Sequence, residues 1–501
     1  MLAVHLPALP ETGLLPVHVS GATRSGPRCS VPRYIATDGQ LRPAKDSHRL
    51  NLQSRTDATP TLRIIPRDQH IISRKNISKA ALRVLYRLNE AGHTAYLVGG
   101  AVRDLLLGLQ PKDFDVATDA TPDEVKRLFR NCRLIGRRFR LAHVVFGPEI
   151  IEVATFRGTG EEGGEGDRHI VDGRIVRDNI WGTIEEDAIR RDFRVNAMYY
   201  DISDFSVRDY VGGMQDLEDR MLRLIGDPDV RYHEDPVRML RAARLAAKLD
   251  MQIDAAAMAP FETLGPLLAD AAPARLFDES LKMFLSGNGL KSFRMLEHCG
   301  LLKFLFPATA RALRRGDDAL RSLVENGLAN TDARIHEGKS VTPAFLFAVL
   351  LWGEVRDVAH QLIGRGVESN EAWAQAAARV VGEQCQRVAI PRRFTFTMEE
   401  IWSLQPRFEQ IQRKRVFRLM AHPRFRAAFD FLLLRADESP AMRELGQWWA
   451  HAQQLPQDVL ASALPAGGGA GANDYVPAPV AARPPRPRRR RRKPGNKSGS
   501  A

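Results

Sequence analysis

Two aspartates stand one residue apart in the stretch PKDFDVATD, residues 111–119. On a β-strand alternate side chains share a face, so Asp113 and Asp115 would project to one side about 7 Å apart, with Phe114 and Val116 on the other. Two uncompensated carboxylates would raise each other's pKa. A divalent cation would compensate both, and oxygen ligands suit Mg²⁺ or Mn²⁺. Taken alone, the pair fits a solvated edge strand better than a metal site, so its neighbourhood has to decide.

A pair of glycines supplies that neighbourhood. Gly99 and Gly100 lie between the strand-like run AYLV and the helical turn AVRDLLLG, and Arg103 follows them. Backbone N–H groups exposed at such a turn can bind an anion that approaches closely. A glycine pair often marks no more than a turn. Followed closely by two aspartates, however, it predicts a phosphate-binding turn that faces a metal site.

Strands and helices alternate around these residues. A helix is expected over residues 77–92, with its apolar residues on one face and Gly92 as a stop. After the aspartates, Thr121 is a good N-cap, Pro122 suits the first helical position and Glu124 completes a capping box. The strand-like runs AHVVFG and EIIEVATFR follow. The alternation continues to about residue 215 and predicts a mixed α/β domain.

From about residue 217 the sequence changes to long stretches of helical spacing, such as EDPVRMLRAARLAAKLD and TPAFLFAVLLWGEV. This half is therefore expected to be all α-helical. The two ends differ from both halves. Residues 1–60 are rich in Pro, Ser, Gly and Arg, and residues 456–501 turn to Ala, Gly and Pro before a run of arginines. Neither end can form an apolar core, so both are expected to be disordered.

The formal net charge of +13 is concentrated in the C-terminal extension. Nine basic and no acidic residues lie between Arg483 and Lys497, and without them the chain would carry +4. We expect this extension to bind RNA or acidic protein partners. No apolar run is long enough to span a membrane, no signal peptide is recognisable, and the four cysteines match no metal spacing. These features predict a cytoplasmic protein with no membrane span.

The stretches LVGGAVRDLLLG and KDFDVAT resemble the nucleotidyltransferase superfamily, in the class that contains tRNA CCA-adding enzymes and bacterial poly(A) polymerases. IEVATFR, EEDAIRRDFRVNAMYYD and RYHEDPVRMLRAARLAAKL agree in the same order, over residues 65–305 and more loosely to about 440. The resemblance implies an α/β nucleotidyltransferase domain with a mixed sheet over residues 61–216. A helical neck over 217–290 would bind nucleotide and RNA, and a helical body over 291–455 would bind RNA.

The resemblance also implies the chemistry. Two Mg²⁺ ions, or Mn²⁺ ions, held by Asp113 and Asp115 would assist attack of an RNA 3′-hydroxyl on a nucleoside triphosphate, with loss of pyrophosphate. The residues that match nucleotide-binding positions of the family are Gly99, Gly100, Arg103, Arg191, Asn196, Asp235, Arg238 and Arg241.

A third catalytic carboxylate is usual in this family, and the sequence offers two candidates. Asp192, in RRDF, matches the position most often counted as catalytic, so it is the residue expected here. Its alternative role is an ion pair with Arg190 or Arg191. Glu152, in the strand-like run IEVATFR, could reach the same metal site and is held in reserve.

Base selection is implied for EDPVR. Positions 235 and 238 of a continuous helix share a face, so Asp235 and Arg238 could present a hydrogen-bonding edge to a base, with Arg241 continuing that face. The alternative is a surface ion pair between Asp235 and Arg238.

The segment RLIGRRFRLAHVVFG, residues 133–147, resembles the poly(A) polymerase version and lacks the HGT-like element of CCA-adding enzymes. The long helical body and the basic extension agree with that. The implied function is a template-independent polynucleotide adenylyltransferase, which adds AMP from ATP to the 3′ ends of single-stranded RNA. The alternatives are a CCA-adding tRNA nucleotidyltransferase and, in another class, a non-catalytic RNA-binding scaffold.

Overall fold

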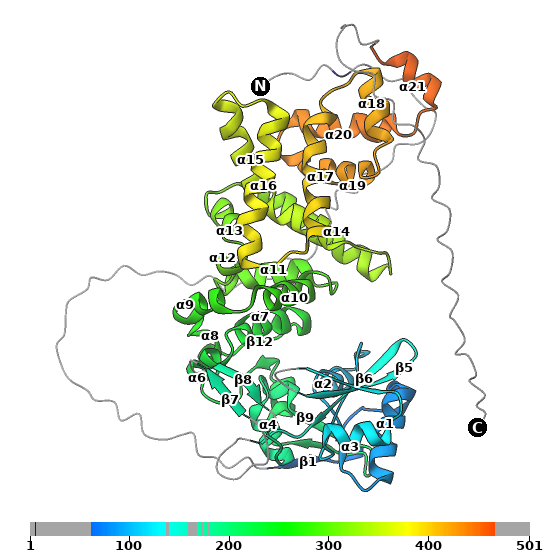
Figure 1. Ribbon diagram of the computed structural model, residues 1–501, viewed down its shortest axis with the longest axis vertical. Coiled ribbons are helices and arrows are strands. Elements are labelled where there is room, and N and C mark those ends of the chain that lie inside the picture. Colours follow the sequence, from blue (N-terminus) through cyan, green and yellow to red (C-terminus); the bar gives the residue numbers. More distant parts are fainter. Residues whose placement is uncertain are drawn as a thin grey trace, which may run out of the picture.

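The structure, a computed structural model, describes Leu6 and the chain from residue 62 to residue 465, except residues 137–139, 159–167, 172, 173 and 179. Figure 1 shows an elongated molecule with a β-sheet and its helices at one end. We call this end the head (residues 62–222), the helices next to it the neck (223–300) and the remaining helices the body (301–464). The domain boundaries expected from the sequence stay a prediction.

The head is built on an eight-stranded sheet in the order β1-β10-β9-β2-β3-β6-β5-β4. β3 and β6 run parallel, and the other neighbours run antiparallel. This mixed sheet confirms the expected α/β domain. The strands are β1 (Arg63–Ile65), β2 (Ala95–Val98), β3 (Asp115–Thr118), β4 (Cys132–Ile135), β5 (Leu141–Phe146), β6 (Glu149–Thr155), β9 (Met198–Asp201) and β10 (Val207–Asp209), with a separate hairpin of β7 (Arg168–Val171) and β8 (Arg174–Asp178).

The two faces of the sheet are covered by different helices. On one face, Val116 and Val153 pack with α1 and α3 in the main apolar core. On the other, Ala117 packs with Ala188 of α4 in a smaller cluster. Because alternate residues share a face, Asp115 projects to the α4 side. The helices of the head are α1 (Lys79–Glu90), α2 (Gly100–Leu106), α3 (Pro122–Leu128), α4 (Ile184–Arg190) and α5 (Gly213–Glu218).

Local sequence signals set the ends of the head helices. Gly92, with a φ of 87°, follows the end of α1, as the sequence predicted. α3 has the predicted capping box: the Thr121 hydroxyl accepts from the Glu124 N–H, and the Glu124 carboxylate accepts from the Thr121 N–H. These caps satisfy N–H groups that have no partner within a helix.

The position of the aspartate pair differs in part from the prediction. β3 begins at Asp115, so Asp113 lies in the turn before the strand. Phe114 and Val116 are buried as expected, and both aspartates are exposed. The alternation of faces was therefore right, but a strand covering both aspartates was wrong.

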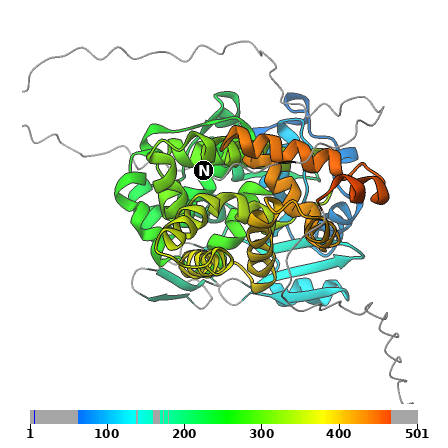
Figure 2. The same ribbon diagram turned by 90° about the horizontal axis from the view of Figure 1, so that it is seen from above.

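The neck and body consist almost wholly of helices, as the sequence predicted. Figure 2, viewed along the long axis, shows the body helices stacked over the rest of the molecule. The neck holds α6 (Pro228–Glu234), α7 (Val237–Leu249), α8 (Ala255–Met258), α9 (Phe261–Leu264), α10 (Pro273–Phe284) and α11 (Gly289–His298). The body holds α12 (Leu302–Leu305), α13 (Pro307–Arg314), α14 (Asp318–His336), α15 (Pro343–Gly364), α16 (Ser369–Arg387), α17 (Arg392–Phe408), α18 (Arg413–Met420), α19 (Phe425–Leu434), α20 (Pro440–Ala452) and α21 (Gln457–Ala463).

The stretch EDPVRMLRAARLAAKLD does not form the single helix that its spacing predicted. α6 ends at Glu234, and Asp235 is extended, with φ −153° and ψ 95°. Pro236 explains the break, because the proline ring disfavours a helical conformation in the residue before it. α7 then begins at Val237, and most of its residues are buried.

The end of the body also corrects an expectation. Residues 457–463, assigned from sequence to the disordered tail, form α21. Leu460 and Leu464 belong to a second apolar core around Phe408 and Trp449, so the few apolar residues of this segment are enough to dock it. Leu6 packs against the same core. The other residues of the segment 1–60, which was expected to be disordered, and the arginine run lie outside the described residues. Across the part of the chain that the structure describes, no helix has the length and apolar character needed to cross a membrane.

Truncating Trp449 tests the second core. Its side chain is fully buried, and its Nε1 donates to the Phe408 carbonyl over 3.0 Å. Trp449→Ala should lower the free energy of unfolding by about 3–5 kcal/mol, because it leaves a cavity and an unpaired carbonyl. Urea denaturation measures this. Phe396→Ala is the control: Phe396 is 56% exposed, so the change should stay within about 0.5 kcal/mol. Equal effects would contradict the packing described.

Candidate active site

A row of polar residues crosses four neighbouring strands of the head. Asp115, the first residue of β3, stands in register with Glu152 of β6, which stands in register with His143 of β5. His143 is in turn paired with Arg133 of the edge strand β4. Residues in register share a face of the sheet, and His143 Nε2 lies 3.3 Å from Glu152 Oε2. The reserve carboxylate Glu152 is therefore the direct neighbour of Asp115.

The carboxylates repel one another. The pKa of Asp115 is raised from 3.8 to about 6, first by loss of hydration among the surrounding protein atoms and then by Glu152, with a smaller contribution from Asp113; Arg191 opposes the rise. Three carboxylates thus lie close together, and the positive charge of Arg191 compensates them only in part. A cation bound there would relieve the repulsion.

This donor set fits Mg²⁺. No group of three or more His, Cys, Asp or Glu side chains among the described residues is arranged as a closed metal site. Mg²⁺ does not need one, because it usually keeps several waters and is bound by one or two carboxylates together with substrate phosphates. The exposed carboxylates of Asp113 and Asp115 suit this mode of binding.

Gly99 brings the chain close to the acids. It precedes α2 with a φ of 70°, a backbone conformation that residues other than glycine rarely adopt. A Cβ added to Gly99 would lie 3.6 Å from Arg191 Nη1 and 4.0 Å from Asp115 Oδ2. Gly100 is the first residue of α2. The predicted turn, the aspartate predicted to bind metal and Arg191 therefore meet at one point.

Arg191 is fixed firmly in this place. Its Nη2 and Nε donate to Asp187 Oδ2 over 2.8 and 3.1 Å, and Nε also donates to the Tyr199 hydroxyl over 2.9 Å. Burial alone would lower the pKa of Arg191, but Tyr199 and Asp187 raise it above its ordinary value. The guanidinium, about one-fifth exposed, is thus a permanent, oriented cation beside the acids.

Asp192 does not join that group of acids. Its Oδ2 accepts from Arg241 Nε over 2.7 Å, and its Oδ1 accepts from Asn196 Nδ2 over 3.2 Å. Burial would raise the pKa of Asp192, but Arg241 and these hydrogen bonds lower it well below its ordinary value. An ion pair was the alternative weighed for Asp192, but with Arg190 or Arg191; the partner on α7 is Arg241.

Arg103 and Asn196 are buried and bonded to protein groups. The Arg103 guanidinium donates to Asp104 Oδ1 over 2.6 and 2.9 Å and to Asn196 Oδ1. Lys248 of α7 donates to the other oxygen of Asp104 over 2.9 Å. These bonds form a continuous series between head and neck, which we call the polar chain: Lys248, Asp104, Arg103, Asn196, Asp192 and Arg241.

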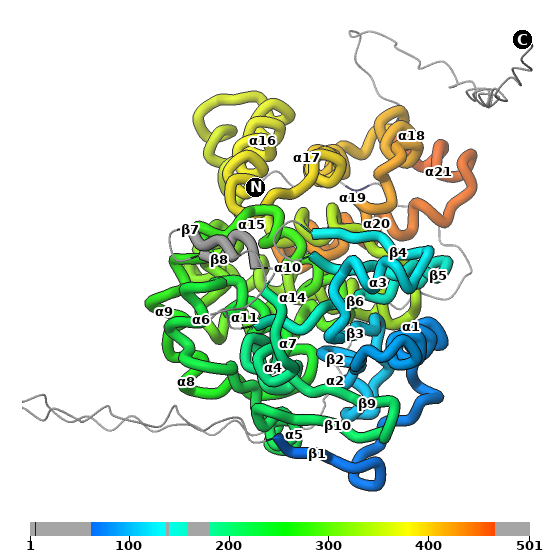
Figure 3. Tube along the Cα trace, turned by 60° about the horizontal axis from the view of Figure 1, so that its bottom comes forward, coloured from blue at the N-terminus to red at the C-terminus, as the bar shows by residue number. Residues whose placement is uncertain are grey.

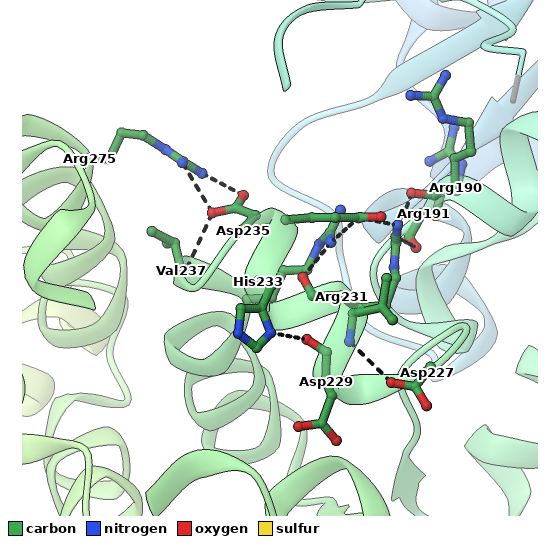
Figure 4. A network of polar contacts seen from close by, with 12 residues as sticks. Arg190, Arg191, Asp227, Asp229, Arg231, His233, Asp235, Val237 and Arg275 are labelled. Carbon is green, nitrogen blue, oxygen red and sulfur yellow. Dashed lines mark hydrogen bonds and ion pairs between the residues drawn. The ribbon is translucent and has the colours of Figure 1, made fainter. Parts of the chain in front are cut away.

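The predicted base-reading residues lie at the break between α6 and α7, shown in Figure 4. Both oxygens of Asp235 accept from Arg275 of α10, over 2.8 and 3.1 Å. Arg238, in the first turn of α7, donates to Glu234 over 2.7 Å. Because Asp235 is outside the helix, the predicted shared helical face is wrong. The alternative weighed was a surface ion pair between Asp235 and Arg238; the structure pairs Asp235 with Arg275 and Arg238 with Glu234.

Arg231 was not singled out from the sequence. Its Nη2 donates to the carbonyls of Arg190 and Arg191 over 2.8 and 2.6 Å, so it satisfies the end of α4 and ties α6 to the head (Figure 4). Burial and then the nearby Arg238 lower the pKa of Arg231 to about 10. His143 and Arg275 were also missed. Strand register could have indicated His143, whereas nothing in the sequence pairs Arg275 with Asp235.

The sequence is similar to those of known proteins. Three family models match the chain: the poly A polymerase head domain over residues 95–223, the probable RNA and SrmB-binding site of polymerase A over 250–313, and the polymerase A arginine-rich C-terminus over 365–494. Poly(A) polymerase I of Salmonella typhi is 54% identical over 404 residues, which cover 79% of this chain and 87% of that protein. The chain belongs to the poly(A) polymerase I family. The resemblance inferred from the sequence motifs is thereby confirmed.

CCA-adding enzymes are more distant from this poly(A) polymerase I family member. The CCA-adding enzyme of Lactobacillus johnsonii is 36% identical over 222 residues, which cover 44% of this chain and 54% of that enzyme. The structure of the Thermotoga maritima CCA-adding enzyme complexed with tRNA aligns with a TM-score of 0.53 and 20% identity, covering 78% of this chain and 86% of that one. This likeness confirms the expected fold.

Asp115→Asn should stabilise the protein in metal-free buffer. A carboxyl whose pKa is higher in the folded state, about 6 against 3.8, is penalised when ionised, so the penalty is present above pH 6 and disappears below pH 4. We expect a gain of about 1 kcal/mol at pH 7.5, reduced from the full shift because the side chain is solvent-exposed. Thermal unfolding in EDTA measures it. A gain that persists at pH 3.5 would contradict this origin.

Proposed function

We propose that the chain is a template-independent polynucleotide adenylyltransferase that adds AMP from ATP to the 3′ ends of single-stranded RNA. Membership of the poly(A) polymerase I family supports the activity. The convergence of Asp115, Glu152 and Arg191 beside Gly99 is the structural observation that carries it. Messenger RNA that receives such a tail would be directed to decay.

The carboxylates would hold the metal. Asp113 is exposed just before β3, Asp115 is exposed at its first residue, and Glu152 lies in register with Asp115. We assign Glu152 as the third carboxylate, in preference to Asp192, whose charge is already matched by Arg241. Two bound Mg²⁺ ions, or Mn²⁺ ions, would supply a more acidic 3′-hydroxyl and charge neutralisation at the leaving pyrophosphate.

The triphosphate would lie along the turn that begins at Gly99. The N–H groups at Gly99 and Gly100 can approach a phosphate because no side chain stands in the way. Arg191, held by Asp187 and Tyr199, offers a fixed positive charge toward the same point. This cation would orient the triphosphate and needs no movement to do so.

Nucleotide choice would rest on the break between α6 and α7. Asp235, in the extended residue between the helices, offers acceptor oxygens, and Arg238, in the first turn of α7, offers donors. Arg241, Asn196 and Arg103 belong to the polar chain, so we assign them the positioning of α7 against the head. In this assignment they hold α7 in position and do not contact the nucleotide.

RNA is the partner that the rest of the chain would serve. One family model covering residues 250–313 is described as a probable RNA-binding site, and the arginine run lies within the arginine-rich model. The basic extension would neutralise phosphates of RNA of any sequence, or bind an acidic protein partner. We infer a cytoplasmic location, since RNA 3′ ends are available there.

Nucleotide incorporation tests the function. The protein is incubated with labelled oligo(A) and each nucleotide separately, in Mg²⁺. Long tails should form with ATP alone. Arrest after three additions on tRNA with use of CTP would show a CCA-adding enzyme instead. RNA binding by the wild-type protein without incorporation of any nucleotide would show a scaffold.

A pair of variants separates the two third-carboxylate candidates. Glu152→Gln should lower kcat by about 100-fold or more and weaken Mn²⁺ binding, because it removes a charged ligand from the metal site. Asp192→Asn should leave Mn²⁺ binding unchanged and lower the melting temperature, because it removes the charged partner of the partly buried Arg241. Steady-state kinetics, Mn²⁺ titration and thermal unfolding distinguish them. Loss of Mn²⁺ binding in the Asp192 variant alone would reverse the assignment.

A further inference from the structure

A cleft lies on the face of the head sheet opposite the carboxylates. It has a volume of about 650 Å³, within the range of about 300–1,000 Å³ typical of sites for small ligands. One wall is α1, and the other is the end of α3 with the turn that leads into β4. The cleft is lined by Arg83, Tyr86, Arg87, Glu90, Leu128, Phe129, Arg130, Asn131 and Phe146. The catalytic site described above uses none of these residues.

The lining combines positive charge with aromatic rings. Three arginines face a single carboxylate, Glu90, which pairs loosely with Arg87 at 3.8 Å. The Arg83 guanidinium lies over the Phe146 ring at 5.5 Å, and Tyr86 is 38% exposed although its hydroxyl accepts from Arg74. Guanidinium groups that can neutralise phosphates, beside aromatic faces on which bases can stack, are the usual composition of a site for single-stranded nucleic acid.

Two exposed arginines lie between the cleft and the face of the sheet that carries the carboxylates. Arg133 ends the row that begins at Asp115 and is exposed on the edge strand β4. Arg130, in the cleft, precedes β4 by two residues and is also exposed. Figure 3 shows β4 and β5 together at one edge of the head beside α3. A strand of RNA that leaves the catalytic row around this edge therefore meets Arg133 and then Arg130.

We propose that this cleft is a second RNA-binding site, which holds a segment of the RNA upstream of the reacting 3′ end. The inference rests on the proposed adenylyltransferase function. Arg87 and Arg130 would bind phosphates from the two walls, and Tyr86 would offer a stacking surface for a base. Adenine stacks well and is the repeating base of the product, so the affinity for RNA should rise as the tail lengthens into the cleft.

The test removes two charges from the cleft. Full-length Arg87→Gln/Arg130→Gln is compared with Lys126→Gln/Arg127→Gln, which removes the same charge from exposed residues of α3 that do not line the cleft. Fluorescence anisotropy gives the affinity for oligo(A) of about six nucleotides, near the lower end of the usual site sizes of about 4–16, and of about thirty, well beyond them. For the long oligomer, the cleft variant should bind about tenfold more weakly, and its salt slope should fall by about 1.4, since each single-strand phosphate contact contributes about 0.7.

The short oligomer and the control define the outcomes. Binding of the short oligomer, and its extension with ATP, should be unchanged in the cleft variant. An equal loss for both lengths, or an equal loss in the control variant, would overturn the proposal. So would unchanged binding of the long oligomer, which would leave an acidic polypeptide as the ligand to examine. These are binding measurements, so they stand apart from the incorporation assay that decides the proposed function.

A second pair of variants tests stacking. Tyr86→Ala should weaken binding of the long oligo(A) about threefold or more, and Tyr86→Phe should restore it, because the ring and not the hydroxyl would stack on a base. If Tyr86→Phe is as weak as Tyr86→Ala, the effect comes from the lost hydrogen bond with Arg74, and the proposed stacking is overturned.

Discussion

The polar chain between α7 and the head is the constraint on which the other features depend. Its buried charges, Arg103 and Asp104, pair with each other, and Asp104 also accepts from the exposed Lys248; the partly buried Asp192 bonds Arg241. Breaking a buried pair by removing one partner typically costs about 3–5 kcal/mol, because the remaining charge is left without compensation. The polar chain therefore allows little movement of α7 against the sheet. It thereby holds the proposed base-reading residues of the neck in a fixed position relative to the proposed catalytic acids of the head.

Asp115 and Asp192 show how one residue type serves two purposes. Asp192 is supplied with a guanidinium and hydrogen bonds by the protein itself, so its charge is complete within the fold. Asp115 has an acidic neighbour in register and only the partial compensation of Arg191. The fold thus leaves a deficit of positive charge at one exposed place on the α4 side of the sheet. A ligand that carries positive charge is needed to complete it.

Sequence motifs predicted local elements of the candidate site but not its long-range pairings. The turn at Gly99, the aspartate pair and the capped helix α3 follow from local rules, and all three were predicted. The pairing of Asp192 with Arg241 joins residues 49 apart in the chain, and the register of Glu152 with Asp115 depends on strand order; neither is encoded locally. The break at Asp235 could have been predicted, because the proline rule applies to it directly.

α7 makes polar contacts with the head through some of its residues and packs in the apolar core through others, so the number of residues between these contacts is critical. Arg241 and Lys248 are seven residues apart, close to two helical turns, so both reach the head, while residues such as Leu240 and Ala243 are fully buried. One inserted residue between Arg241 and Lys248 would turn the rest of the helix by about 100°. Polar and apolar contacts would then be lost together. The polypeptide can absorb insertions at an exposed turn such as Gly147–Pro148, between β5 and β6, whereas an insertion within α7 would disrupt the contact between neck and head.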